Sequence, residues 1–135
     1  MYRNVLVPVA FDREHKPEAA LKAARTLVAP GGRVTILHVM EEAPPYAISF
    51  IPEDYLHDLK QAIREELDAM AEGFDSAEAV LVDGQPGRTI LHWAEDKGVD
   101  CIVIASRRPG IEDRVLGSTA SWVVGRADCA VHVVR

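Results

Sequence analysis

The sequence predicts an α/β protein whose parallel sheet is covered by helices on both faces. Strand-like and helix-like segments alternate along the whole chain of 135 residues, which is typical of a parallel sheet with helical crossovers. The run Cys101–Ile104 is continuously apolar, as expected of a strand buried on both faces. The length corresponds to about one ordinary domain, so we expect residues 1–135 to form a single domain.

The first third of the chain contains two strands and one helix. Arg3–Val9 is predicted to be a strand, and Pro17–Val28 a helix, because alanine and leucine recur there at helical spacing and proline suits the first helical turn. Pro30-Gly31-Gly32 is expected to end this helix, and Arg33–Val39 is expected to form the second strand.

A long connection, Met40–Pro52, follows the second strand and contains three prolines. Its apolar stretch Pro44–Ile51 has three candidate roles: a flap over a ligand, an oligomer contact, or packing on the neighbouring helix. A helix is expected from Glu53 to about Glu72, since one apolar stripe runs along it, and Gly73 is expected to stop it.

The second half of the chain continues the alternation. The expected elements are a strand at Ala77–Val82, a turn at Gly84–Gly87, a helix at Arg88–Lys97, a strand at Asp100–Ala105, a helix at Ser118–Arg126 and a strand at Ala130–Val134. In open parallel sheets, ligands bind beyond the carboxyl ends of strands where the winding reverses. We therefore expect a site at the ends of the first and fourth strands, Pro8–Ala10 and Ala105–Arg108.

Composition excludes several classes of function. The net charge of −6 argues against nucleic-acid binding, which depends on a basic surface. No apolar run approaches about 18 residues, so no membrane insertion is expected, and the first residues resemble a strand rather than an export signal, which favours a cytoplasmic location. The spacing of Cys101 and Cys129 fits neither a redox pair nor a zinc site; both are predicted to be reduced and structural.

The stretch after the fourth strand is the strongest candidate for a ligand site. Two adjacent arginines, Arg107 and Arg108, precede a Pro-Gly turn at Gly110, and a helix is expected to start near Gly117-Ser118-Thr119. Unpaired N–H groups at a helix start attract anions, and arginines suit phosphate. The stretch therefore indicates a phosphate site. The alternative is a solvated basic loop in which Ser118 caps the helix, and both interpretations remain open at this point.

Other chemistry finds little support in the sequence. The stretch lacks the GxxxxGK[ST] loop of ordinary ATPases and the GxGxxG fingerprint, and no GxSxG nucleophile motif occurs. The five histidines show no metal-binding spacing, so we predict no metal site and no catalytic residue. The last strand, Ala130–Val134, is expected at a sheet edge, where an unpaired apolar strand favours association; a homodimer is therefore predicted.

The segments in this order resemble the universal stress proteins. The resemblance covers the whole chain and rests on five segments: VLVPV at Val5–Val9, LHV at Leu37–Val39, GQPGRTIL at Gly84–Leu91, DCIVIASRRPGIEDRVLGSTASWVV at Asp100–Val124 and ADCAVHVVR at Ala127–Arg135. It implies a single flavodoxin-like (Rossmann-like) doubly wound sheet of five parallel strands in the order 3-2-1-4-5. It also implies a dimer through the last strand and binding of ATP or AMP.

The resemblance further implies which residues would bind the nucleotide. Pro8 and Val39 would frame the adenine, and Ala10 would lie beside the adenosine. The residues near the phosphates would be Ala105, Arg107, Arg108, Gly110, Gly117, Ser118 and Thr119. Mg²⁺ could accompany ATP, although no dedicated ligand set is visible.

Two positions depart from the pattern of the nucleotide-binding members. Ala105 stands where the first glycine of G-x-x-G-x9-G-[ST] is expected, and the loop is one residue shorter, as in a short-loop branch of the family. Ala10 stands where the family usually has an aspartate that contacts the adenosine. Losing such a contact costs about 1–3 kcal/mol, or roughly ten- to hundred-fold in affinity.

Three functions follow from these observations. The resemblance favours a regulatory or sensing dimer that binds an adenine nucleotide and takes part in the stress response. The alternatives are a nucleotide-free module that binds an unknown partner protein, and a slow ATPase. Dimers could also pair into tetramers.

Overall fold

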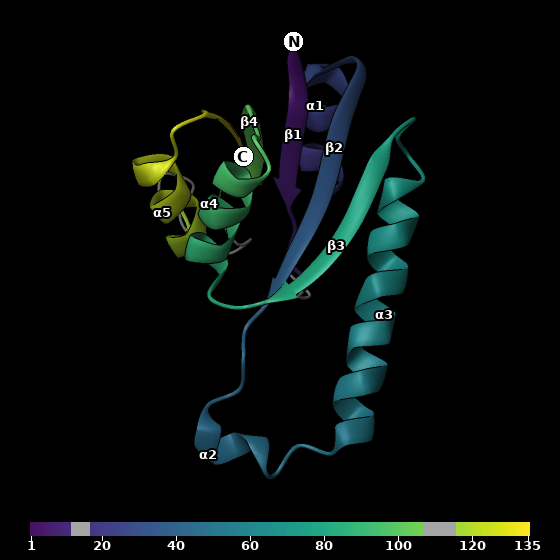
Figure 1. Cartoon of the computed structure of the whole chain (residues 1–135), viewed down its shortest axis with the longest axis vertical. Coiled ribbons are helices and arrows are strands. Elements are labelled where there is room, and N and C mark those ends of the chain that lie inside the picture. The colour runs from purple at the N-terminus through teal and green to yellow at the C-terminus, as the bar shows by residue number, and fades with distance from the viewer. Residues whose placement is uncertain (12–16, 107–115) are drawn as a thin grey trace.

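A computed structural model gives the structure of residues 1–11, 17–106 and 116–135. Five parallel strands form one sheet in the order β3-β2-β1-β4-β5 (Figure 1). This confirms the strand order that the resemblance implies. The strands are β1 (Tyr2–Pro8), β2 (Val28–Met40), β3 (Ala77–Asp83), β4 (Cys101–Ala105) and β5 (Ala130–Val134). The helices are α1 (Glu18–Leu27), α2 (Pro45–Ile48), α3 (Glu53–Ala71), α4 (Pro86–Asp96) and α5 (Ser118–Arg126).

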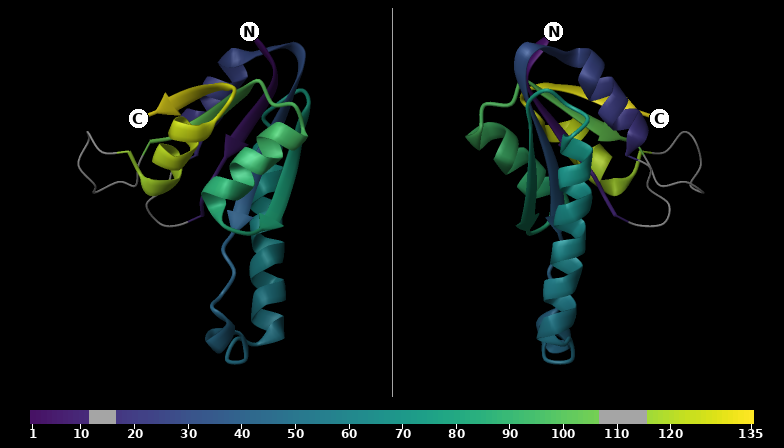
Figure 2. Two further views of the ribbon diagram at one scale, coloured as in Figure 1. Left: turned by 60° about the vertical axis from the view of Figure 1, so that its left-hand side comes forward. Right: turned by 90° about the vertical axis from the view of Figure 1, so that its right-hand side faces the viewer.

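Helices cover the sheet on both faces, as the apolar strands predict. Helices α1 and α3 pack on one face, and α4 and α5 pack on the other (Figure 2). A hydrophobic core lies on each face of the sheet, and alternate residues of a strand belong to different cores. In β1, Val5 and Val7 face α1 and α3, whereas Leu6 faces α4 and α5. In β4, the side chains of Cys101, Ile102 and Val103 are completely buried. None of the helices in the described part of the chain has the length and apolar character that a membrane crossing requires.

The start of β2 differs from the prediction. The helix ends at Leu27, one residue before its predicted end at Val28. The strand begins at Val28 rather than at Arg33, so Pro30-Gly31-Gly32 lies within β2. The reason is a bulge: Val28 already pairs with Tyr2, and regular pairing resumes where Arg33 meets Asn4. Gly31 has a φ of 78°, a left-handed conformation that glycine adopts without steric cost.

The start of α4 also differs from the prediction. The predicted turn Gly84–Gly87 is shorter, because the helix begins at Pro86. Proline fits the first helical position, where its missing N–H is not needed. The side-chain oxygen of Gln85 accepts a hydrogen bond of 2.7 Å from the Arg88 N–H and caps the helix. Gly87 is buried as a result, with the Trp122 side chain of α5 against it.

The connection between β2 and α3 extends beyond the sheet. The short helix α2 lies within it, and Figure 1 shows α2 and the first part of α3 projecting past the carboxyl end of β2. The side chains of Tyr46, Ile48 and Phe50 are 80%, 53% and 83% exposed. Packing on the neighbouring helix therefore does not bury them, and that alternative is wrong for these three residues.

Asp100 joins the beginnings of β1 and β4. Its carboxylate accepts hydrogen bonds of 3.0 Å from the N–H groups of Arg3 and Asn4, and its own N–H donates to the Asn4 carbonyl. The predicted strand started at Asp100, whereas β4 begins one residue later, at Cys101. Charge-assisted bonds of this kind are stronger than neutral ones, and they fix the register at which the two central strands meet.

Both cysteines are free thiols, in line with the sequence prediction. Burial raises the pKa of the Cys101 thiol to about 11, with smaller contributions from Cys129 and Asp100. Burial also raises the pKa of Cys129. Because the thiolate is the reactive form, neither side chain is activated as a nucleophile at neutral pH.

The contact between Gly87 and Trp122 makes a testable prediction about stability. A Cβ at Gly87 would lie 2.6 Å from Cδ1 of Trp122, whose ring also carries the Arg126 guanidinium at 3.5 Å. We expect Gly87→Ala to lower the free energy of unfolding by about 1–3 kcal/mol, since the indole must move. The matched variant Gly125→Ala, with open space around the new Cβ, should raise it by about 0.4–1 kcal/mol. Urea denaturation measures both, and equal effects of the two substitutions would contradict this packing.

Candidate functional site

A cavity of about 460 Å³ lies at the carboxyl ends of β1, β2 and β4. Each strand contributes one predicted residue to its wall: Pro8, Val39 and Ala105. The first turn of α5 closes the wall, and the α3 residues Leu59 and Ile63 line it from the other face of the sheet. The cavity thus occupies the place where the strand order reverses between β1 and β4, which is where open parallel sheets bind ligands.

The amino end of α5 supplies a positive pole to this cavity. Gly117 occupies the N-cap position, and no side chain of the described residues caps the helix. Ser118 is the first helical residue, so the alternative in which its hydroxyl caps the helix is wrong. The N–H groups of a first helical turn carry partial positive charge, and Ser118, Thr119 and Ala120 of this turn line the cavity.

Ser106 holds the end of β4 to two other elements. Its N–H donates a hydrogen bond of 2.8 Å to the carbonyl of Val134 in β5, and its carbonyl accepts from the N–H of Gly117. The residue is only 2% exposed and lines the cavity. Its hydroxyl has no hydrogen-bond partner among the described residues. A buried hydroxyl of this kind needs a partner from elsewhere, such as a ligand or a water molecule.

His38 and Phe11 shape the cavity near the ends of β1 and β2. Nδ1 of His38 lies 2.8 Å from the carbonyl oxygen of Val9, and it carries the proton because a carbonyl can only accept. The Phe11 ring meets the imidazole edge-on at 4.9 Å between centroids. Both residues line the cavity, and the sequence prediction included neither. The alternation of side chains along Leu37–Val39 contains no signal for this contact, because Val9 lies 29 residues away in the sequence, directly after β1.

The structure gathers most of the predicted site residues around this one cavity. Seven of them line it: Pro8, Ala10, Val39, Ala105, Gly117, Ser118 and Thr119. The other three, Arg107, Arg108 and Gly110, lie outside the described residues. In the described ranges, no group of three or more histidine, cysteine or acidic side chains could hold a metal ion.

The fold and the cavity define a class: a doubly wound α/β protein with an anion-attracting helix start at the point where the winding reverses. The model of the universal stress protein family matches residues 1–135. The chain therefore belongs to the universal stress protein family.

Curated relatives match along their full length. The universal stress protein encoded beside the QAH/OAS sulfhydrylase gene of Thermus aquaticus is 32% identical over 139 aligned positions, with 100% of both chains covered. Universal stress protein YxiE of Bacillus subtilis is 30% identical, again with 100% of both chains covered.

Solved structures share the fold. The hypothetical protein MJ0577 superposes with a TM-score of 0.84 at 25% identity, covering 99% of this chain and 96% of its own. More distant structures include a universal stress protein from Archaeoglobus fulgidus in complex with dAMP, at 20% identity and a TM-score of 0.65, covering 99% of this chain and 98% of its own. They also include a family member from Arabidopsis thaliana with AMP bound, at 17% identity and a TM-score of 0.65, covering 97% of this chain and 90% of its own. At these identities the likeness shows the fold alone.

The hydroxyl of Ser106 makes a testable prediction for the ligand-free protein. Because a buried hydroxyl without a partner costs about 1–3 kcal/mol, we expect Ser106→Ala to leave the free energy of unfolding unchanged or to raise it by up to about 1 kcal/mol. Urea denaturation without ligand measures the change, and Ser76→Ala at an exposed position before β3 is the control. A clear loss of stability in Ser106→Ala would mean that the hydroxyl has a partner within the protein.

Proposed function

We propose that this universal stress protein binds an adenine nucleotide, ATP or AMP, and acts as a regulatory or sensing dimer in the stress response. The observation that carries the proposal is the convergence of three strand ends and the start of α5 on one cavity. Its volume of about 460 Å³ falls within the range of about 300–1,000 Å³ that is usual for small-molecule sites.

The apolar part of the cavity is suited to the base. Pro8 and Val39 would frame the adenine, and Val39 belongs to a strand end whose backbone groups can recognise a ring edge. Ala10 lies on the wall where the adenosine would sit. The hydrogen bond between His38 and Val9 holds the two strand ends in place on this side. Burial of a planar, largely apolar ring would supply most of the binding free energy here.

The other end of the cavity is suited to phosphate. Ser118 and Thr119 would donate backbone N–H groups and hydroxyls, and the Ser106 hydroxyl would gain the partner that it lacks. Arg107, Arg108 and Gly110 remain predicted phosphate contacts. A charge-assisted hydrogen bond contributes about 1.5–3 kcal/mol, and a helix terminus about 0.3–1 kcal/mol. A few such contacts together with burial of the base approach the roughly 8 kcal/mol of micromolar binding.

Family members with bound nucleotides support the proposal. Three related structures are complexes with dAMP, cAMP and AMP. In this chain the nucleotide would act as a bound signal rather than as a substrate. Mg²⁺ would arrive with ATP, held by the phosphates.

We further propose that the protein is a cytosolic homodimer. Strand β5 (Ala130–Val134) lies at an edge of the sheet, and pairing with its copy would satisfy the free backbone groups of that edge. Ser106, which lines the cavity, donates its N–H to Val134 of β5. The dimer contact through β5 would therefore lie close to the phosphate end of the cavity. Dimers could pair further into tetramers.

Ser118→Ala tests the phosphate end. We expect calorimetry with Mg-ATP to give micromolar to sub-millimolar affinity for the natural chain, and a roughly tenfold or greater loss in Ser118→Ala, since one charge-assisted hydrogen bond disappears. Ser76→Ala, at an exposed position that does not line the cavity, should bind like the natural chain. The absence of heat or thermal shift at millimolar Mg-ATP would overturn the proposed function.

Ala10→Asp tests the adenosine end through a gain of affinity. The substitution restores the carboxylate that the family usually has at this position, so we expect adenosine to bind roughly ten- to hundred-fold more tightly. Ala69→Asp, which adds the same charge on the exposed face of α3, is the control. Unchanged adenosine affinity in Ala10→Asp would show that the adenosine does not lie beside this residue.

A further inference from the structure

The segment that projects beyond the sheet, residues 41–59, concentrates exposed apolar side chains. We call it the arm. Four large apolar residues of the arm are at least half exposed: Tyr46 (80%), Ile48 (53%), Phe50 (83%) and Tyr55 (59%). Elsewhere in the described ranges only Met1 and Val124 are comparably exposed. Large apolar side chains that are exposed together in one segment indicate a place where another molecule binds.

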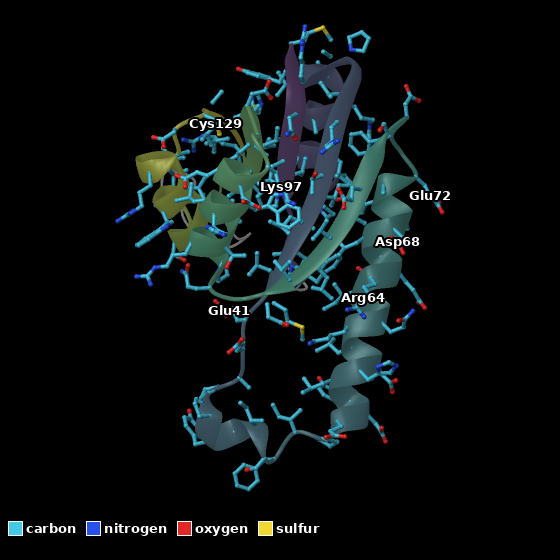
Figure 3. All side chains as sticks on the ribbon, viewed as in Figure 1. Glu41, Arg64, Asp68, Glu72, Lys97 and Cys129 are labelled. Carbon is cyan, nitrogen blue, oxygen red and sulfur yellow. The ribbon has the colours of Figure 1, made fainter. Side chains whose placement is uncertain are left out.

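The charge of the arm is entirely negative at neutral pH. It carries five carboxylates, at Glu41, Glu42, Glu53, Asp54 and Asp58, and residues 34–59 contain no lysine or arginine. The first cation after the arm, Lys60, lies with its Nζ 3.5 Å from a carboxylate oxygen of Asp83 in β3. His57 is the single basic side chain within the arm. Glu41 lies where the chain leaves β2 (Figure 3), and Glu53 and Asp54 begin α3.

We propose that the arm docks a basic amphipathic segment of another protein. The exposed aromatic and aliphatic side chains would bury the apolar face of such a segment, and the carboxylates around them would pair with its lysines or arginines. Aromatic side chains such as Phe50 and Tyr46 dominate the energetics of protein interfaces, and complementary charge at the rim sets partner choice and association rate. The proposal goes beyond nucleotide binding, because the exposed apolar residues that carry it, Tyr46, Ile48, Phe50 and Tyr55, do not line the cavity.

The negative charge of the arm also favours a basic segment over two other binding partners, a second copy of this chain and an anionic membrane. A second copy packed arm to arm would bring ten carboxylates together with no lysine or arginine from residues 34–59 to offset them, and like charges at an interface cost free energy. An anionic membrane surface would repel the arm for the same reason. A basic partner has neither difficulty.

Titration of the full-length protein with a synthetic leucine/lysine amphipathic helix, followed by fluorescence anisotropy, tests the proposal. We expect saturable binding that weakens as salt is raised. Phe50→Ser and the double variant Glu53→Lys/Asp54→Lys should each weaken it about tenfold or more. The matched double variant Glu65→Lys/Glu66→Lys, an exposed acidic pair in the half of α3 that lies against the sheet, should bind within about twofold of the natural chain. All three substitution sites are exposed, and circular dichroism checks that the variants are folded.

Five outcomes would overturn the proposal. The peptide does not bind, or it binds equally well to Phe50→Ser. Glu65→Lys/Glu66→Lys weakens binding as much as Glu53→Lys/Asp54→Lys, which would mean diffuse attraction to an acidic protein. Sedimentation shows an oligomer that Phe50→Ser dissociates, so that a second copy covers the arm. The protein binds phospholipid vesicles through Phe50, so that the arm is a membrane contact. Because the peptide titration contains no nucleotide, its failure leaves the proposed nucleotide site untouched.

Discussion

The hand of the strand–helix–strand crossover is the constraint on which this molecule depends. Each crossover between parallel strands is right-handed, so a sheet that grows from β1 toward β3 carries its helices on one face. Growth in the opposite direction, toward β4 and β5, carries them on the other face. At the boundary between β1 and β4, the helices leave in opposite directions. The carboxyl ends of these strands therefore open onto a cavity that neither helical layer fills.

One set of hydrogen bonds holds this boundary at the start of its strands, and a second set fixes the elements around the carboxyl end of β4. At the start of the strands, the Asp100 carboxylate accepts from the N–H groups of Arg3 and Asn4 and fixes β4 beside β1. At their carboxyl ends, Ser106 joins β4 to Val134 of β5 and to Gly117 at the start of α5. The position of the α5 dipole at the cavity thus follows from backbone contacts.

Sequence patterns predicted the fold well because burial is a local signal in this chain. A strand such as Cys101–Ala105 is apolar along its whole length, since both of its faces are covered. Boundaries were less predictable where a single long-range contact decides them, as for Val28, which pairs with Tyr2. The site was partly predictable for the same reason: Gly117-Ser118-Thr119 is a local helix start, whereas Ser106 and His38 matter through partners that lie 28 and 29 residues away in the sequence.

The central claim is that an adenine nucleotide occupies the cavity between β1 and β4, and backbone amide NMR tests it most directly. In ¹H–¹⁵N spectra of the isotope-labelled protein titrated with AMP, we expect saturable shifts at Val39 and Ala105 and at Ser118 and Thr119, from the two ends of one ligand. The amides of Tyr46 and Phe50 in the arm should stay in place. Saturable shifts confined to residues away from the cavity, or no shifts at millimolar AMP, would contradict the claim.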